Sequence, residues 1–150
     1  MKLSNAQIGK CGELLVQLKL LSYGIESAIL STDYGIDLVA FSKRLQCAKT
    51  IQVKANLKAK PAGGKGKLYL GWWANDNSAA DVFAFVDLDF LRVWLIETRK
   101  LASIAQQHSN GRFQFFMSID PKTKPRRDGK PIHDYQFSEH LFENSAHRIF

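Results

Sequence analysis

The stretch "TIQVKAN", residues 50–56, has the alternation of a half-buried strand and carries a lysine on its polar face. Ile51, Val53 and Ala55 would point to one side of such a strand, and Gln52, Lys54 and Asn56 to the other. A lysine is costly in a half-buried strand unless a nearby group uses its charge. The stretch therefore predicts a strand that belongs to a functional site.

Two apolar stretches before this strand complete a predicted meander. "IESAIL" (25–30) and "GIDLVAF" (35–41) are typical of strands. The short connections "STDY" and "SKRLQCAK" favour antiparallel neighbours.

The N-terminal segment predicts an amphipathic helix over about residues 5–22. Ser4 and Gln7 form a capping-box signature at its start, and Gly24 supplies the stop. An apolar stripe recurs at helical spacing: Ile8, Cys11, Leu15 and Leu18, widened by Leu14 and Leu21.

The second half of the chain alternates between further strands and helices. Strands are predicted over 81–88, 92–97 and 113–119, and helices over 98–107, with Thr98 as its cap, and over 135–150. Residues 57–67 are predicted as a flexible basic loop, followed by the aromatic and then polar "LYLGWWAND". We expect one α/β domain over residues 1–150, with a mixed central sheet flanked by helices.

The charge of the chain predicts a polyanionic partner. The net charge is +7, and no acidic residue occurs between Asp37 and Asp76. A second basic run, "KTKPRRDGK", covers 122–130. Solubility is the ordinary reason for such runs, but two of them in separate loops favour phosphate contacts. The predicted nucleic-acid-binding residues are Lys58, Lys60, Lys65, Lys67, Lys124, Arg126 and Arg127.

The remaining composition indicates a cytoplasmic protein without a membrane partner. No apolar run approaches the roughly 18 residues that span a bilayer. The N-terminus lacks the apolar block and cleavage site of a signal peptide. Cys11 and Cys47 lie in apolar patterns and are predicted to be reduced core residues.

A cluster of oxygen ligands and one lysine is predicted around the meander. Fourteen residues separate Asp37 from Gln52, and neighbouring strands lie about 4.8 Å apart. A hard cation such as Mg²⁺ takes oxygen ligands. Candidate ligands are the Asp37 carboxylate, the Gln52 amide and the Val53 carbonyl, with Glu13 as a second negative charge. Lys54 would then neutralise the carboxylates.

Each of these residues also has an ordinary alternative. Asp37 could be a solvated aspartate at a turn, and Lys54 one charge of an edge strand. Gln52 could be a plain polar strand residue, and Glu13 a solvated partner of Lys10 on the helix surface.

Glu on the first helix, G-x-D on a strand and Gln-x-Lys on the next strand resemble the PD-(D/E)XK, restriction-endonuclease-like nucleases. Among them, the chain resembles small single-domain prokaryotic members such as intron-homing endonucleases and Holliday-junction resolvases. The resemblance covers residues 8–56. It implies an endonuclease that depends on Mg²⁺ or Mn²⁺ and acts on DNA, although the residues do not distinguish DNA from RNA.

The resemblance also assigns roles to the candidate residues. Asp37 and Gln52 would be metal ligands, Lys54 would position or activate the attacking water, and Glu13 would support the metal. The chain departs from the common pattern because Gln52 replaces Glu or Asp, and because no proline precedes the G-x-D core at Tyr34. Two other functions therefore stay open: a catalytically lapsed nucleic-acid-binding module of the same fold, and an interaction protein whose basic loops meet an acidic protein.

One such site cuts one strand at a time, so paired cuts imply a homodimer or homotetramer. The predicted contact surfaces are the strand "FQFFMSI" (113–119) and the apolar face of the last helix, with Phe137, Leu141 and Phe142.

The remaining aromatic and titratable side chains have simpler expectations. Trp72 and Trp73 could stack on nucleobases, but we expect at least one to pack in the core or at a sheet edge. The histidines, which show no metal spacing, are predicted to be structural or solvent-facing: His108, His133, His140 and His147. Four aspartates near strand ends are predicted to form turns: Asp76, Asp81, Asp87 and Asp89.

Overall fold

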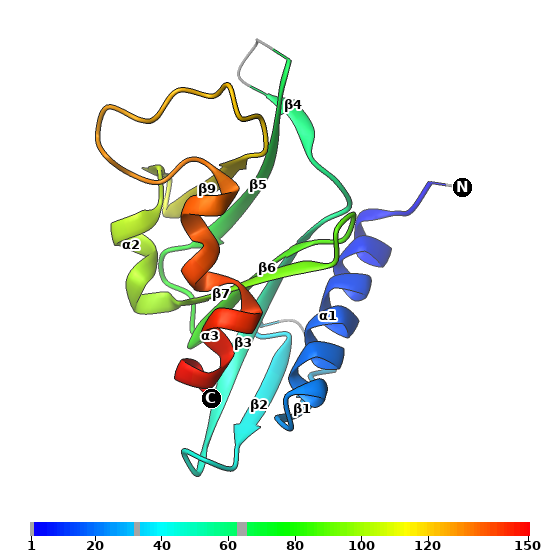
Figure 1. The fold of residues 1–150 in the computed structure, drawn as a ribbon. Coiled ribbons are helices and arrows are strands. Elements are labelled where there is room, and N and C mark those ends of the chain that lie inside the picture. The colour runs from blue at the N-terminus through cyan, green and yellow to red at the C-terminus, as the bar shows by residue number, and fades with distance from the viewer. Residues whose placement is uncertain (1, 32–33, 63–65) are drawn as a thin grey trace.

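The computed structural model describes residues 2–31, 34–62 and 66–150, and it contains two β-sheets (Figure 1). The first sheet has the strand order β1-β2-β3-β6-β7. Its strands are β1 (Glu26–Ile29), β2 (Leu38–Ser42), β3 (Cys47–Asn56), β6 (Val82–Asp87) and β7 (Arg92–Glu97). Among these described strands only β3 and β6 pair in parallel, so the predicted mixed sheet of an α/β fold is confirmed.

The predicted meander is also confirmed. β1, β2 and β3 pair antiparallel in chain order, and the first residue of β2, Leu38, pairs with Ile51. Residues 52–56 of β3 therefore extend past the start of β2, on an edge where β2 no longer pairs with them. Part of the connection "STDY" lies outside the described residues.

Helix α1 (Asn5–Ser22) begins at the predicted capping box, in which the Ser4 hydroxyl accepts from the Gln7 amide. The helix packs against β3 through Gly12. A Cβ atom added at Gly12 would lie 2.6 Å from the Ala55 Cβ, so only glycine permits this close approach.

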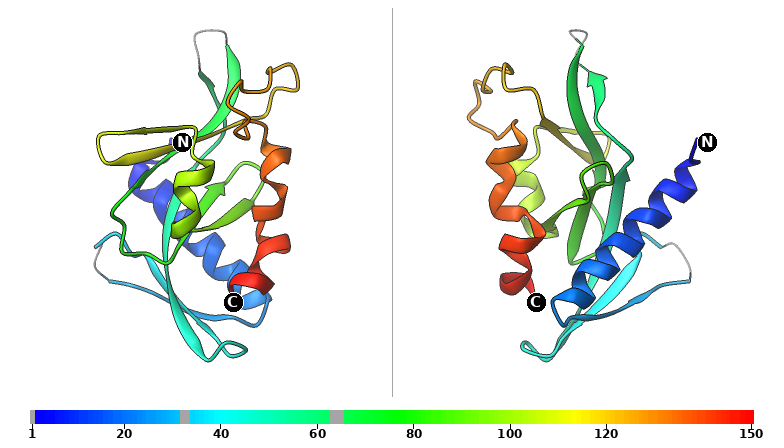
Figure 2. Two further views of the ribbon diagram at one scale, coloured as in Figure 1. Left: turned by 90° about the vertical axis from the view of Figure 1, so that its left-hand side faces the viewer. Right: turned by 45° about the vertical axis from the view of Figure 1, so that its right-hand side comes forward.

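α1 and the C-terminal helix α3 (Phe142–Ile149) cover the same face of the first sheet. Val16 and Leu20 of α1 and Phe142 of α3 join one buried cluster with the sheet residues Ile51 and Val53. Figure 2 shows the two helices, blue and red, converging near the C-terminus, where the rings of Tyr23 and Phe142 are in contact.

A second sheet, which the sequence did not predict, packs on the other face of the first. Its order is β4-β5-β9-β8, formed by β4 (Lys60–Ala62), β5 (Lys67–Asn75), β8 (Gln107–Ser109) and β9 (Arg112–Ser118). Trp72 of β5 and Phe115 of β9 are buried against Phe83 and Phe85 of β6. The predicted basic loop over 57–67 is thus partly the strand β4 of a hairpin.

The helix predicted over 98–107 is shorter than expected. It consists of a 3-10 helix, η1 (Thr98–Lys100), and a short α-helix, α2 (Leu101–Ile104). It ends where Ala105 takes an extended conformation. Thr98 does not cap it, because the Thr98 hydroxyl donates to the Ala80 carbonyl.

The helix predicted over 135–150 is interrupted at Leu141. The 3-10 helix η2 (Asp134–His140) precedes this residue and α3 follows it, because Leu141, with a ψ of 142°, is not helical and forms a β-bridge with Trp94. Phe137 and Phe142 are fully buried, as are Phe115 and Met117 of the strand "FQFFMSI". The predicted contacts of a second copy with these four side chains are therefore wrong, since they form the core of the protein itself.

The two cysteines are free but exposed, so the prediction of core positions is wrong. Cys11 lies on the outer surface of α1, and Cys47 begins β3 beside a turn. Among the described residues, no helix is both long and apolar enough to cross a membrane.

Candidate active site

The open edge of β3 is defined by the direction of its backbone groups. The carbonyls of Thr50 and Asn56 accept hydrogen bonds from Asp81 and Leu88, on the side of β6, at 3.0 and 2.9 Å. The Ile51 carbonyl accepts from the Asp37 amide, on the opposite side. Because backbone groups alternate in direction along a strand, the amide and carbonyl of Val53 also point to that opposite side, beyond the start of β2.

The Asp37 carboxylate occupies this open edge. Its Oδ2 atom accepts a hydrogen bond of 2.6 Å from the Val53 amide. The side chain thus takes the place of the missing β2 partner and lies on the edge to which the Val53 carbonyl also points. Gly35, two residues before Asp37, has a φ of +79°, a conformation that favours glycine at this turn.

Gln52 lies beside the segment that leads to Asp37. Only 5% of the Gln52 residue is exposed. Its Oε1 accepts from the Ser78 hydroxyl at 3.4 Å, and a Cβ added at Gly35 would lie 3.5 Å from its Nε2. The structure therefore brings Asp37, Gln52 and Val53 together. Ser78, in the turn before β6, gave no signal in the sequence.

Lys54 shares the strand face of Gln52. The residue is half-buried, and within the described parts of the chain its ammonium group forms no hydrogen bond or ion pair. A half-buried cation that forms no ion pair within the described residues suits the binding of an anionic ligand.

Glu13 lies on α1, which packs on the face of β3 opposite to Gln52 and Lys54. Gly12, its neighbour on α1, contacts Val53 and Ala55, whose side chains point away from the face of Gln52 and Lys54. The Glu13 carboxylate forms an ion pair of 2.7 Å with Lys10. This is the surface pair that the sequence offered as the alternative for Glu13.

The donor set at the open edge fits a hard cation. No group of three or more His, Cys, Asp or Glu side chains gathers as a metal site in the described regions. Asp37 and Val53 instead offer one carboxylate and one backbone oxygen, and Gln52 adds an amide whose oxygen accepts a long hydrogen bond from Ser78. Mg²⁺ accepts such a set because it keeps several of its waters when bound.

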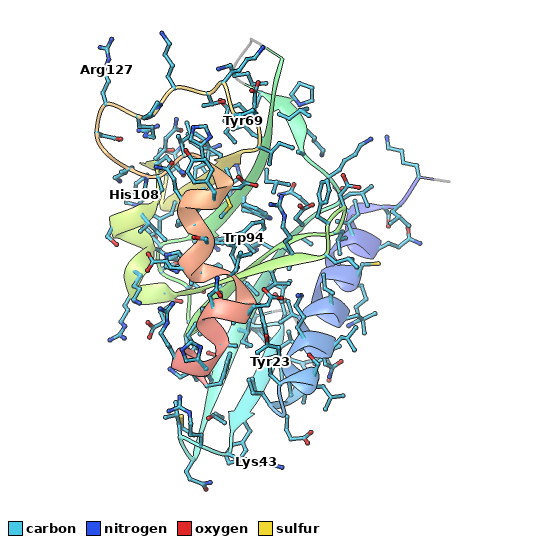
Figure 3. All side chains as sticks on the ribbon, viewed as in Figure 1. Tyr23, Lys43, Tyr69, Trp94, His108 and Arg127 are labelled. Carbon is cyan, nitrogen blue, oxygen red and sulfur yellow. The ribbon has the colours of Figure 1, made fainter. Side chains whose placement is uncertain are left out.

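Three of the predicted phosphate-binding lysines lie on or beside the β4–β5 hairpin: Lys58, Lys60 and Lys67. Lys58 and Lys60 are exposed there, whereas Lys67 donates to the Lys122 carbonyl at 3.1 Å. Lys65 lies outside the described residues. In the second basic run, Lys124 and Arg127 are exposed, and Arg127 points away from the protein (Figure 3).

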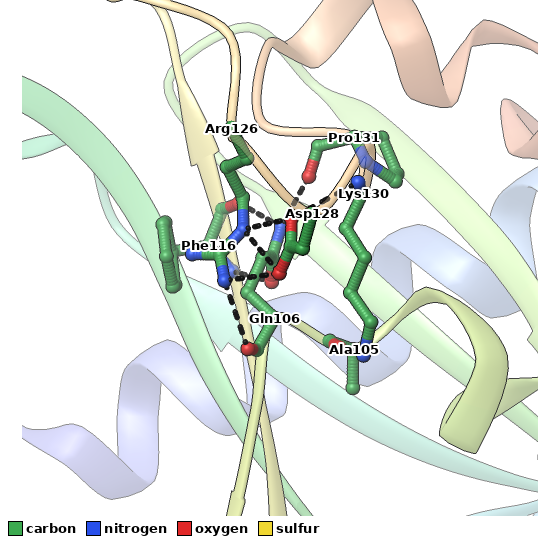
Figure 4. Close-up of polar contacts among 7 residues, drawn as sticks. All are labelled: Ala105, Gln106, Phe116, Arg126, Asp128, Lys130 and Pro131. Carbon is green, nitrogen blue, oxygen red and sulfur yellow. Dashed lines mark hydrogen bonds and ion pairs between the residues drawn. The ribbon is translucent and has the colours of Figure 1, made fainter.

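Arg126 is already bound within the protein (Figure 4). Its guanidinium group donates to both carboxylate oxygens of Asp128, the shortest contact being 2.6 Å, and also to the Gln106 carbonyl. The hydrogen bond from Arg126 lowers the pKa of Asp128 to about 2. The buried Gln106 side chain donates to the carbonyls of Phe116 and Pro131. Arg126 and Gln106 therefore hold the second basic run against β9.

The other aromatic and histidine predictions are confirmed. Trp72 is buried and Trp73 is 44% exposed. His133 contacts the Thr123 carbonyl, and His108 pairs with Asp76. His140 is also buried, and its burial lowers its pKa.

Comparisons with known proteins support the fold. No family model and no curated protein matches the sequence. A bacterial homing endonuclease of known structure aligns with 97% of this chain and 91% of its own, with a TM-score of 0.62 and 14% sequence identity. A Holliday junction resolvase from the archaeal hyperthermophile Archaeoglobus fulgidus aligns with 71% of this chain and 82% of its own, with a TM-score of 0.50 and 14% identity. The chain thus has the restriction-endonuclease-like fold, as the resemblance over residues 8–56 predicted.

Proposed function

We propose that the protein is a metal-dependent endonuclease that hydrolyses phosphodiester bonds of DNA. The observation that carries the proposal is the Asp37 carboxylate, held at 2.6 Å by the Val53 amide on the open edge of β3. Gln52 and Lys54 flank Val53 in the chain. The two similar structures, a homing endonuclease and a Holliday junction resolvase, support a nuclease at the level of the fold.

Mg²⁺ or Mn²⁺ would be held by the Asp37 carboxylate, the Gln52 amide oxygen and the Val53 carbonyl. Glu13 would add negative charge from the other side of the strand. Such a cation, when bound, makes water a stronger nucleophile at neutral pH and offsets the charge of the phosphate.

The residues of the chain supply orientation and charge. The hydrogen bond from the Val53 amide fixes the Asp37 carboxylate, which therefore needs no reorganisation when a ligand binds. Lys54, which follows Val53 in the chain, would supply a positive charge to the same site. This ammonium group stabilises the negative charge that develops on the phosphate oxygens, and it donates a hydrogen bond that orients the attacking water.

A nucleic-acid-binding module with lapsed catalysis is the second candidate. Two observations favour it: Gln52 contributes no charge, and Glu13 is already paired with Lys10. Under this alternative, the basic hairpin formed by β4 and β5 would still bind phosphates, and so would the second basic run, residues 122–130.

A panel of substrates and metals tests the proposal. Supercoiled plasmid, linear DNA, branched DNA and RNA are incubated with Mg²⁺, Mn²⁺ or EDTA, and binding in EDTA is measured separately by gel shift. We expect cleavage of at least one DNA with Mg²⁺ or Mn²⁺, and none with EDTA. Binding without cleavage under either metal would support the lapsed module. Absence of both would indicate an interaction protein.

A further inference from the structure

A pocket lies on the outer face of the second sheet, separate from the proposed catalytic cluster. Its volume is about 460 Å³, within the range of sites that bind small molecules. Residues from five strands line it, among them Asn56, Tyr69, Gly71, Gln107, Gln114 and Phe116.

Aromatic rings form one wall of the pocket, and a glycine keeps it open. The rings of Tyr69 and Phe116 meet edge to face, with their centroids 6.0 Å apart. Gly71 pairs with Phe116 across β5 and β9. A Cβ added at Gly71 would meet only the Phe115 carbonyl, at 3.9 Å, so the space above this glycine is open.

The polar groups of the pocket are amides rather than charges. Within the described chain, the side chains of Gln107 and Gln114 form no hydrogen bond. Asn56 donates its Nδ2 to the Gly71 carbonyl at 2.8 Å, which leaves its Oδ1 as an acceptor. Among the described residues of the lining, Lys60 is the one charged side chain and none is a carboxylate. Side-chain amides pair with the hydrogen-bonding edges of nucleobases, and adenine is their commonest partner.

The position of Asn56 connects the pocket to the catalytic strand. Asn56 follows Lys54 by two residues, so both side chains leave the same face of β3. Two residues of strand span about 7 Å. A nucleotide next to the phosphate at Lys54 can therefore reach the pocket.

We infer that this pocket holds one unpaired nucleobase of the DNA strand whose phosphate lies at Lys54. The inference rests on the proposed function. A base that leaves the stack is held by aromatic side chains and read by hydrogen bonds to its edge, and the pocket provides both. Trp73 follows Tyr69 and Gly71 on the same strand face. It is 44% exposed, with the Arg112 guanidinium 6.0 Å from its ring, and it offers a stacking surface for the next base.

Binding in EDTA tests the inference without requiring cleavage. The probe is a DNA duplex with one bulged adenine, compared with the same duplex carrying an abasic residue at the bulge. The variant Gly71→Phe fills the pocket at a position with ordinary backbone angles, and Gly71→Ala is the matched control that leaves most of it open.

We expect the parent and Gly71→Ala to bind the adenine bulge about tenfold more tightly than the abasic bulge. Gly71→Phe should bind both probes equally, with the affinity that the parent has for the abasic one. Equal binding of the two probes by the parent, or an undiminished preference in Gly71→Phe, would overturn the inference. Tighter binding of a bulged RNA, abolished in Gly71→Phe, would overturn the assignment to DNA. A protein that prefers the bulged base but cleaves nothing would retain the pocket and lose only the proposed hydrolysis.

Discussion

At the scale of single residues, strand pairing made part of the site predictable. Asp37 directly precedes β2, and Gln52 lies on the neighbouring strand β3 of a short meander, so their proximity follows from local sequence. The bond from Ser78 to Gln52 joins segments far apart in the chain, and no local pattern encodes it. The pairing of Glu13 with Lys10 is local, but the sequence equally allowed a role at the metal.

Gln52 provides the first prediction at this scale. Gln52→Glu should keep cleavage and reach its half-maximal rate at lower Mg²⁺, because a carboxylate keeps the oxygen and adds a negative charge. Gln52→Leu should lose on the order of 10²–10³ in rate, because the oxygen is removed. Ser78→Ala is the control, since it removes the long hydrogen bond to the Gln52 amide and the bond that Ser78 accepts from the Ala80 amide, but leaves the Gln52 oxygen itself in place. Identical Mg²⁺ dependence in all four proteins would remove Gln52 from the site.

At the scale of elements, the sequence predicted those with strong local signals. α1 and the strands of the first sheet carry a cap, helical spacing or continuous apolar runs. β4 was missed because "KPAGGKGK" has the composition of a loop, and its pairing with β5 is the reason it is extended. The last helix is broken because Leu141 pairs with Trp94, a tertiary contact that helical periodicity does not reveal.

α1 carries an exposed apolar stripe, and we expect the predicted homodimer contact to form there. Leu14, Leu18 and Leu21 are 51%, 63% and 58% exposed and follow the spacing of a coiled-coil seam, with Cys11 one step before them. We expect Leu18→Glu to yield a monomer in light scattering at micromolar concentration, and the parent a dimer or tetramer. Ala6→Glu, exposed on the same helix outside the stripe, should leave the assembly unchanged. A parent that is itself a strict monomer would contradict this prediction.

The basic hairpin should contribute phosphate contacts rather than sequence readout. Changing Lys58, Lys60, Lys65 and Lys67 together to Ala should weaken binding to all DNA sequences alike. The slope of log K against log salt should flatten by about 0.9 for each phosphate of the duplex that the variant no longer neutralises. The control changes Lys43, in the turn at the opposite end of β3 (Figure 3), and Lys49, the third residue of β3, and should alter the slope less. An unchanged slope in the hairpin variant would assign its lysines to solubility.

At the scale of the whole molecule, the fold and the net charge both favour a nucleic-acid partner. The restriction-endonuclease-like fold places an open strand edge beside a second sheet whose outer face carries basic and aromatic residues. The net charge of +7 favours a polyanionic partner. The fold class followed from the order of elements, whereas the division into two sheets depends on which strands pair at long range.

Stability should fall in mild acid because of His140. Burial lowers its pKa below the ordinary 6.5, and the charges of Lys100 and Arg148 lower it further against the opposing charge of Glu139. The unfolded chain then takes up a proton first, so the stabilisation present above pH 6.5 is lost as pH falls through the lowered pKa.

The melting temperature measured between pH 7.5 and 5 tests this effect. We expect a smaller decrease in His140→Asn than in the parent, while the exposed His147→Asn should follow the parent. Glu97 affects the pH dependence of stability only at a lower pH than His140 does. Burial alone would raise its pKa, but Lys100 and Arg99 bring it below the ordinary 4.5. Parallel curves for the parent and His140→Asn would contradict the assignment.

The rate of plasmid cleavage in Asp37→Asn and Lys54→Ala tests the proposed active site most directly. The parent and the control Lys43→Ala should cleave with Mg²⁺ or Mn²⁺ and stop in EDTA. Both site variants should lose on the order of 10²–10³ in rate, while their melting temperatures and their binding to DNA in EDTA show that they remain folded. A parent that cleaves with neither metal, or a Lys54→Ala variant that cleaves as fast as the parent, would contradict the proposed function.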